Sequence, residues 1–581
     1  MFAKKAPLGA FFSAHAANAA GERPLASLFW LIAWSLTLAW CWLLPNNYPP
    51  WGTFHMDAWA AAALLPMVAA VLWRTRNDNQ LSVLAAAILL LSLSPGLQWL
   101  AGLIEFSGTA WLAFGYMLAF FLMIVVGNRW ERHTPGQLGD GLFLAIGIAG
   151  LLSVGIQLHQ WLGLEYSTTW IVEGSTGRPF SNIRQPNQLA TLLLWGLLAL
   201  AWGGVRGYIR PAVLLLAAGY FLFGLALTES RTAWLGICIL GIASWYWRAL
   251  LPWRGGHWVV AVFIGGFFVV VWMIPAINEA LFLDVRDQSL GDLVRLSGET
   301  RPQIWALFLQ AATLRPWFGY GWNQLTYAHL AVALDQPALF VLYAHSHNLF
   351  LDLVLWWGFP FGLLVSMGIC LWFWQRLHAV RDAYGMLMFL MVAVIGNHAM
   401  FELPLHYAYF LLPTGLAIGA IESRTGVLML SLRKARVASS AWLVSAVLFG
   451  FLVYDYMRIE ASYEVLRFEW MQVQSKADRN PPDVYVLDQL RSLIVYSRFE
   501  PAREMSAAHL DWLRKVASLY PSSGVIHKYA VALAWNGSPD KALLWLRRMC
   551  SVSPESQCGA VKRSWQELAT RDPLIARVEW K

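Results

Sequence analysis

Charged side chains are scarce in this sequence. Asp, Glu, Lys and Arg make up 13% of the 581 residues, whereas hydrophobic residues make up 58%. A soluble globular domain carries about 25% charged residues, so the composition excludes an ordinary soluble protein. Apolar runs of about 20 residues, the length that crosses a bilayer, recur instead from Leu25 to Met457. The sequence therefore predicts an all-α, polytopic membrane protein.

Several soluble-enzyme motifs are also absent. The chain has no His-Glu-x-x-His zinc pattern and no Gly-x-Ser-x-Gly nucleophile elbow. It has no tract of like charges, and its formal net charge of +8 is typical of cytoplasmic lysines and arginines in a membrane protein, so nucleic-acid binding is not indicated. A metal site is the minor alternative to metal-free chemistry, and its ligands would come from His345, His347, Asp352, Glu402 and His406.

Thirteen apolar segments are predicted to cross the membrane, within an expected range of about 12–13 helices. The third is short for a span. Residues 1–457 are predicted to form a transmembrane catalytic domain. The segments lie near Leu25–Leu44, Ala58–Trp73, Leu81–Ser94, Trp111–Gly127, Gly141–Leu158, Gln188–Gly203, Pro211–Leu227, Thr232–Trp247, Trp258–Ile274, Asn348–Trp374, Tyr384–Met400, Tyr407–Ile421 and Ala441–Met457.

Basic residues gather in alternate connections between these segments. Because connections rich in arginine and lysine stay in the cytoplasm, the bias places the two long remaining connections, His159–Asn187 and Pro275–His347, on the opposite side. In a Gram-negative cell that side is the periplasm, so residues 275–347 are predicted to form a large periplasmic loop of an inner-membrane protein. The basic residues are Arg74, Arg76, Arg129, Arg132, Arg206, Arg210, Arg248, Arg254, Arg376, Arg381, Arg424, Arg433, Lys434 and Arg436.

An odd number of spans places the polar tail, residues 458–581, in the same outer compartment. The tail is predicted to be a small helical domain, and Pro521–Pro554 resembles one tetratricopeptide-type helix pair. A helical cap and a partner-binding module remain alternatives. Cys550 and Cys558 lie in this oxidising compartment, which leads to the hypothesis of a disulfide between them.

Arginines outside the cytoplasm run against the positive-inside trend and call for an explanation. Arg184 precedes Pro186, a natural first-turn residue, and Arg231 follows Ser230, a good N-cap. Both arginines thus stand at helix starts, where unpaired N–H groups and the helix dipole attract phosphate. Arginine adds a two-point contact with phosphate oxygens, so the pair is predicted to hold a pyrophosphate. The alternatives are an ion pair between Arg231 and Glu229, and contact of Arg184 with lipid headgroups.

His347 stands immediately before Asn348, the expected N-cap of a long apolar helix. The positive helix end disfavours imidazolium, so we expect a lowered pKa for His347 and a neutral base near neutral pH. The alternative is a capping or core histidine. His345 should point elsewhere if the segment is extended. Asp352, about one turn into the helix, is predicted to orient a neighbour or pair with a cation.

Arg301 begins a stretch predicted to form an amphipathic helix on the outer membrane face. It would hold substrate there, or it would belong only to an interfacial aromatic anchor. Glu402 and Tyr407 stand at the start of a later span on the same face.

At these residues the chain resembles the O-antigen ligase and polymerase superfamily, and within it the protein O-oligosaccharyltransferases that glycosylate pilins. The likeness covers about Ser181–Tyr409. The polar tail favours the protein-glycosylating branch. The matching pieces are Arg184-Gln-Pro-Asn-Gln188, Ser230-Arg231, Arg301 to Trp305, Phe318-Gly-Tyr-Gly321, His345-Ser-His-Asn348 and Glu402-Leu-Pro-Leu-His-Tyr407.

The resemblance implies a GT-C-like ligase fold and a reaction. A glycan on undecaprenyl pyrophosphate would be transferred in one piece to a serine or threonine of a periplasmic acceptor, such as a pilin-like protein. No metal or other cofactor would be needed. His347 would be the catalytic base, and Arg184, Arg231 and Arg301 would bind the pyrophosphate. Gln185 and Tyr407 match positions that the family links to activity.

Two other functions compete with this prediction. An O-antigen ligase or polymerase would transfer the glycan to a sugar hydroxyl, and the tail argues mildly against it. A transporter of lipid-linked sugar is the rival from another class. The clustering of polar residues at one face, with few midway across the membrane, disfavours transport.

Overall fold

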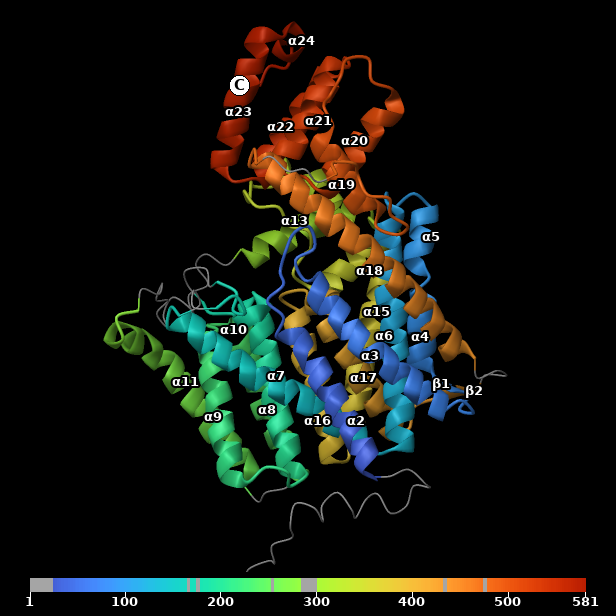
Figure 1. Ribbon diagram of the computed structural model, residues 1–581, viewed down its shortest axis with the longest axis vertical. Helices are drawn as coiled ribbons and strands as arrows, with labels where there is room; N and C mark the ends of the chain where they lie inside the picture. The colour runs from blue at the N-terminus through green and yellow to red at the C-terminus, as the bar shows by residue number, and fades with distance from the viewer. Residues whose placement is uncertain are drawn as a thin grey trace, which may run out of the picture.

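The computed structural model describes residues 24–164, 168–173, 178–251, 255–283, 300–431, 436–473 and 478–580. Helices account for nearly all of the regular structure in these ranges (Figure 1). Their one sheet is an antiparallel pair of three-residue strands, β1 (Gln80–Ser82) and β2 (Met429–Ser431). The predicted all-α, polytopic membrane fold is confirmed.

Each of the thirteen predicted spans falls on a helix. Eight helices in the described ranges are long and apolar enough to cross a membrane, and three shorter apolar helices accompany them. The third predicted span lies on α4 (Val83–Leu91), and the helical φ/ψ of Ser92 and Leu93 carry the chain on into α5 (Ser94–Leu100), so that Val83–Leu100 is one of the eight. The helices that carry the spans are α2 (Pro24–Ala39, continued by the short turn η1, Trp40–Trp42), α3 (Phe54–Arg74), α4 (Val83–Leu91), α6 (Ser107–His133), α7 (Gln137–Trp161), α8 (Pro186–Val205), α9 (Pro211–Leu227), α10 (Arg231–Tyr246), α11 (Gly256–Ala280), α15 (Leu349–Ala379), α16 (Ala383–Ala399), α17 (Ala408–Arg424) and α18 (Val437–Trp470).

The long predicted loop differs from the structure at its beginning. Pro275 lies inside α11, which continues to Ala280, so the loop begins later than expected. The second half of the loop is folded: α13 (Arg301–Leu314) and α14 (Leu325–Val332) share a core with the first turns of α15. Residues 284–299 of the predicted loop lie outside the described residues. Hydropathy marks where the apolar stretch ends, whereas the helix itself continues.

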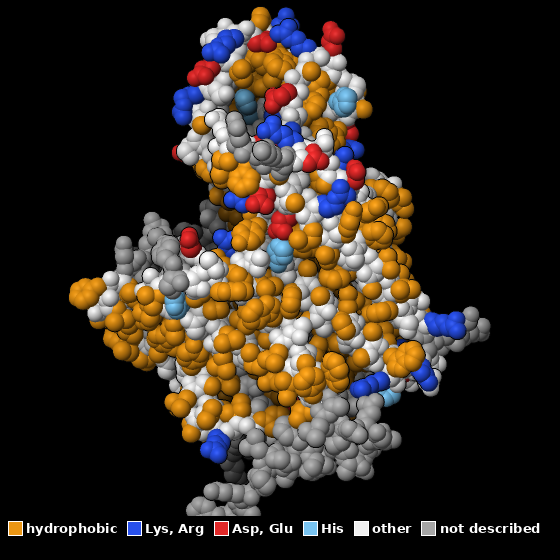
Figure 2. Space-filling view, in the orientation of Figure 1, with side chains coloured by type: hydrophobic (Ala, Val, Ile, Leu, Met, Phe, Trp, Pro, Cys, Tyr) orange, Lys and Arg blue, Asp and Glu red, His pale blue; other side chains and the backbone are white. Residues whose placement is uncertain are grey.

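Charged side chains are separated along the bundle. Figure 2 shows a broad hydrophobic band over the helices, with charged side chains gathered on the tail and at the opposite end. At the end opposite the tail, arginines pair with carboxylates, as in Arg206–Asp140 (2.8 Å) and Arg132–Asp78 (2.7 Å). This distribution agrees with the alternation of basic connections along the sequence, although Arg254, Arg433 and Lys434 lie outside the described residues.

The tail is a stack of short amphipathic helices. α18 runs without a break past the predicted boundary at residue 458, and the helices of the tail follow it. The predicted helix pair is present as α21 and α22, which turn at Asn536-Gly537. Cys550 and Cys558 are joined in a disulfide. The tail helices are α19 (Asp488–Arg498), α20 (Ala507–Leu519), α21 (Ser523–Trp535), α22 (Pro539–Val552), α23 (Glu555–Arg571) and α24 (Pro573–Ala576).

Helices α6 and α17 approach each other most closely at glycines. A Cβ atom on Gly127 would meet the carbonyl oxygen of Leu416, and one on Gly419 would meet the carbonyl oxygen of Ile124. Small residues allow such backbone contact between membrane helices, where packing rather than the hydrophobic effect drives association. This contact matters for the candidate active site described below because α17 begins beside that site.

Gly419→Leu should therefore destabilise the helical bundle. The new side chain has no space next to the α6 backbone, and overpacking of this kind costs about 1–3 kcal/mol. Thermal unfolding of the protein in detergent measures the effect. Gly450→Leu is the matched control, because nothing lies within 4 Å of a Cβ atom at that position on α18. An equal loss of thermal stability in both variants would contradict the close packing of α6 on α17.

Candidate active site

The connection between α16 and α17 forms the centre of the candidate site. It contains Glu402 and the short turn η4 (Pro404–His406). The Glu402 carboxylate accepts hydrogen bonds from the side-chain amides of Gln185 (3.1 Å) and Asn187 (2.8 Å), and the Arg301 guanidinium lies 3.8 Å away. One carboxylate thus joins the beginnings of α8 and α13 to the connection before α17.

Capping explains why these helices begin where they do. The Gln185 side chain accepts the N–H of Gln188, with Pro186 at the first helical position of α8. Ser230 caps α10, and its hydroxyl also donates to the side-chain oxygen of Asn187 at 2.6 Å. Asn348 caps α15 by accepting two backbone N–H groups. The helix starts predicted at Pro186, Ser230 and Asn348 are confirmed.

Three arginines, Arg178, Arg231 and Arg301, lie close enough to Glu402 and Glu229 for their charges to interact. The Arg178 guanidinium donates to the carbonyl of Thr228 at 2.7 Å. Burial lowers the pKa of Arg178, and the charges of Glu229, Glu402, Arg231 and Arg301 all act on it. The cluster therefore holds one more cation than anion, in a partly buried place where charges interact more strongly than in water. An incoming anion would balance it.

Arg184 is directed to another part of the molecule. Its guanidinium donates to the carbonyl of Asn47 at 2.8 Å, in the connection between α2 and α3. Arg184 has a left-handed backbone (φ 62°), which turns the chain just before α8. The neighbouring Gln185 then reaches Glu402, whereas the Arg184 side chain remains exposed on the loop.

The two histidines of the segment before α15 lie together. The ring centroids of His345 and His347 are 4.1 Å apart, and His345 was expected to point elsewhere only in an extended segment. His347 has a left-handed backbone (φ 58°), and the segment is therefore not extended. Burial lowers the pKa of His345 to about 2, with His347 and His406 as further causes, and burial lowers the pKa of His406 to about 4. Both His345 and His406 are neutral at pH 7.

Asp352 fixes the position of the histidine segment. One of its oxygens accepts the backbone N–H of Ser346 at 2.9 Å and the Ser346 hydroxyl at 2.6 Å. Of the two predicted roles, orientation of a neighbour is the one that these hydrogen bonds fulfil. The amide of Asn348 lies 3.5 Å from the carbonyl of Met400, which brings the segment onto the connection between α16 and α17.

The connection between α16 and α17 therefore contacts both Arg301 and the segment that carries the histidines. Arg301 donates to the carbonyl of Phe401 at 3.3 Å, beside the Met400 carbonyl that faces Asn348. Tyr407 ends the connection, and burial raises its pKa to about 12, so its hydroxyl stays protonated at pH 7. One short stretch of backbone thus contacts Arg301 and the segment that carries the two histidines.

Sequence reasoning missed two residues of this arrangement. Arg178 lies in the same long connection as Arg184, and the rule that singled out Arg184 applied to it equally. Asn187 lies inside the Arg-Gln-Pro-Asn-Gln piece, but its bond to Glu402 joins residues far apart in the sequence.

Comparison with known proteins finds matching families over most of the site. Residues 212–366 match an O-antigen ligase family and residues 179–202 match a protein glycosylation ligase family. Residues 386–567 match the C-terminal part of a virulence-factor membrane-bound polymerase family, which includes the connection with Glu402 and most of the tail.

Two relatives from Acinetobacter baylyi extend these matches. A general O-oligosaccharyltransferase is 27% identical over 528 residues, which is 88% of this chain and 90% of the relative. A ComP-specific O-oligosaccharyltransferase is 24% identical over 440 residues, which is 74% of this chain and 78% of the relative.

The protein is a membrane-embedded glycosyltransferase. The chain carries matches to O-antigen ligase and protein glycosylation ligase families and is similar over most of its length to O-oligosaccharyltransferases.

Glu402→Ala should destabilise the protein and weaken activity. It leaves two amides without their acceptor and removes a carboxylate from among three arginines, and each orphaned buried donor costs about 1–3 kcal/mol. Thermal unfolding and glycan transfer measure the two effects. Glu173→Ala is the control, because Glu173 is an exposed carboxylate in the connection before α8. Unchanged stability of Glu402→Ala would remove Glu402 from the centre of the site.

Proposed function

We propose that the enzyme transfers a preassembled glycan from undecaprenyl pyrophosphate to a serine or threonine hydroxyl of a periplasmic acceptor, a pilin-like protein. The proposal places the protein in a bacterial inner membrane with its site open to the periplasm. Its main support is the single connection, Met400–Tyr407, that contacts both Arg301 of the arginine cluster and Asn348, the residue next to His347. The names of the two relatives support a protein acceptor.

The arginine cluster suits a pyrophosphate leaving group. Arg178, Arg231 and Arg301 supply permanent charges that arginine alone among side chains presents as a planar fork. As the bond to the sugar breaks, negative charge develops on the pyrophosphate, and cations fixed in advance stabilise it. Arginines can supply this charge without a metal ion, so we expect a metal-independent reaction. Arg184, whose guanidinium is directed to the carbonyl of Asn47, lies apart from this cluster and would bind a lipid headgroup.

His347 is the proposed base. It takes the proton of the acceptor hydroxyl, and the oxygen attacks the anomeric carbon of the glycan as the bond to pyrophosphate breaks. Displacement in one step inverts that carbon. Ser346, held by Asp352, fixes the backbone on which His347 stands. The neutral neighbours His345 and His406 add no competing positive charge.

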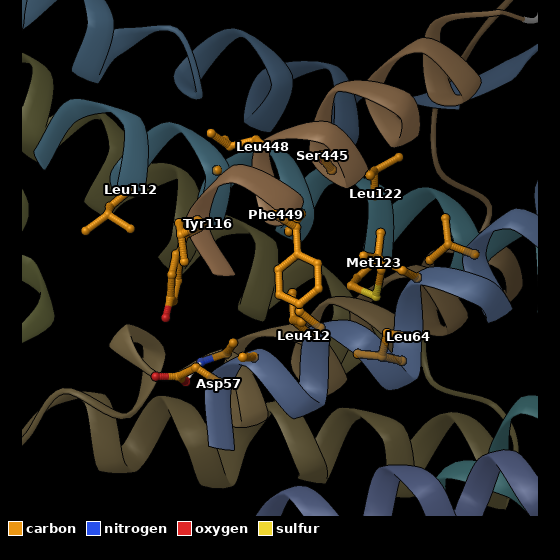
Figure 3. A pocket seen from close by; sticks show the side chains of 18 of the residues that line it. Asp57, Leu64, Leu112, Tyr116, Leu122, Met123, Leu412, Ser445, Leu448 and Phe449 are labelled. Carbon is orange, nitrogen blue, oxygen red and sulfur yellow. Dashed lines mark hydrogen bonds between the residues drawn. The ribbon is translucent and has the colours of Figure 1, made fainter. Parts of the chain in front are cut away.

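An apolar pocket provides a place for the lipid chain of the donor. It is lined by α3, α6, α17 and α18, and Figure 3 shows Leu64, Leu112 and Phe449 around it. Its lining follows α3 from Phe54 to Val68, which is about 21 Å of helix. At one end Asp57 accepts the first N–H of α17, that of Ala408, at 2.6 Å. The pocket therefore ends one residue from Tyr407, and it suits a single isoprenoid chain.

An O-antigen ligase that uses a sugar hydroxyl is the second candidate, favoured by the match over residues 212–366. The acceptor separates the two functions. Purified enzyme, a lipid-linked glycan and either a pilin or a lipopolysaccharide core should yield glycosylated pilin, detected by mass. Transfer to the core alone would replace the proposed acceptor. Transfer in detergent, with no second compartment, excludes a pure transporter.

His347→Ala should abolish transfer while the protein remains folded. General-base catalysis contributes about 100- to 10,000-fold to a reaction rate, so the rate of transfer should fall by about that factor. Acceptor mass after a timed reaction measures it. His509→Ala is the control, since His509 is exposed on the tail. Near-normal transfer by His347→Ala would show that His347 is not the base.

Wild-type transfer should continue in EDTA, because the proposed reaction needs no metal ion.

Ala61→Phe should weaken donor use by filling the pocket from α3. The KM for a donor with a full isoprenoid chain should rise about tenfold, which corresponds to 1.4 kcal/mol of lost binding, with less effect on a donor that carries a short chain. Ala212→Phe is the control on an exposed face of α9. An equal rise for both donors would place the lipid chain elsewhere.

A further inference from the structure

The segment that carries His345 and His347 has no regular secondary structure. It runs from residue 333 to residue 348, between α14 and α15. A loop of this length loses much conformational entropy when it is held in one shape, so its position depends on the contacts that it makes. The question is which part of the molecule supplies them.

The end of the segment next to α15 is tied within the membrane part. Near α15, Ser346 is bound by Asp352. Before it, the backbone N–H of Tyr343 donates to Nδ1 of His329 at 3.1 Å, and the ring centroid of Tyr343 lies 5.8 Å from that of His347. His329 is 1% exposed, and burial lowers its pKa to about 4, so its ring stays neutral and Nδ1 can accept.

The middle of the segment is held by the tail. The backbone N–H of Phe340 donates to the carbonyl of Ser551 at 3.1 Å. Leu342 packs against the tail core, and Ala333 at the beginning of the segment is buried in that core. The charge of Asp335 acts on Arg548 of α22, whose pKa is lowered mainly by burial.

The contacts with the tail gather at one corner, between α22 and α23. Ser551 directly follows Cys550, and Cys550 is joined to Cys558 on the next helix. The disulfide closes the corner and so limits how far the Ser551 carbonyl can move. Both cysteines also pack against the tail core.

A second group of contacts docks the tail independently of this corner. The Tyr327 hydroxyl on α14 donates to the carbonyl of Lys515 at 3.0 Å. Glu105, before α6, lies 2.9 Å from Arg514 and 3.5 Å from Lys515. Disturbing the corner therefore need not release the tail from the membrane part.

We propose that the tail positions the histidine segment, and that the corner closed by Cys550–Cys558 is the positioning element. Ser551, Arg548 and the disulfide act through the segment and touch no substrate. The inference rests on the proposed role of His347 in transfer. It assigns the tail a part in the reaction itself, as the support of the segment that carries the base.

The test uses the full-length protein with Cys550→Ala and Cys558→Ala combined. We expect kcat to fall about 10- to 100-fold, the effect of misplacing a catalytic group by about 1 Å, with the donor KM unchanged. Hydrogen exchange of residues 336–347 should rise. Dithiothreitol should lower the wild-type rate in the same way and leave the double variant unaffected. Wild-type kcat and unchanged exchange in the double variant would overturn the proposal.

Arg548→Ala provides a second variant that keeps the disulfide. It should also lower kcat and raise exchange in residues 336–347, and Arg548→Lys should restore both because it keeps the charge beside Asp335. Arg503→Ala is the control: it breaks an exposed ion pair within the tail, Arg503–Asp572 (2.9 Å), and should change neither. An Arg548→Ala variant indistinguishable from Arg503→Ala would count against the positioning role.

The exchange measurement separates this inference from the proposed function. If His347→Ala kept its transfer activity, the base assignment would fail, while increased exchange of residues 336–347 in the double variant would still support positioning by the tail. If His347→Ala lost activity and the segment stayed equally protected in every tail variant, the base would stand and the positioning role would be overturned.

Discussion

The carboxylate of Glu402 is the interaction on which the site depends. Its side chain is 19% exposed, and a charge removed this far from water is costly unless partners replace the lost hydration. Gln185, Asn187 and Arg301 supply those partners from two different segments. The connection between α16 and α17 can hold its shape only while α8 and α13 begin where they do. The carbonyls of Met400 and Phe401 on that connection then serve as fixed points for Asn348 and Arg301.

This arrangement also explains how cations can be kept close together. Like charges repel, and Arg178, Arg231 and Arg301 would separate if nothing lay between them. Glu229 and Glu402 hold them in place and leave a modest excess of positive charge. A pyrophosphate can enter such a cluster without finding every cation already neutralised. Because the cations are positioned before the reaction, little reorganisation is needed when charge moves onto the leaving group.

The predictable features were those set by neighbouring residues. The length of the apolar segments located all thirteen helices. Capping residues located the starts of α8, α10 and α15. What failed depended on the path of the backbone or on distant contacts. No local pattern announces the left-handed φ of His347 or the closeness of its ring to that of His345. The different surroundings of Arg184 and Arg178 follow from tertiary contacts with Asn47 and Thr228, which the sequence does not display.

The division into a membrane part and a tail is likewise a feature of composition more than of packing. The boundary at residue 458 follows the change in polarity, yet α18 crosses it unbroken. The tail core also includes Phe106, Leu330 and Ala333, which come from the membrane part. These side chains would be left exposed if the tail moved away, so burial of apolar surface opposes its release. Since Ala333 lies at the start of the segment that carries His347, the same packing that holds the tail in place also orders that segment, and stability of the tail and geometry of the site cannot vary independently.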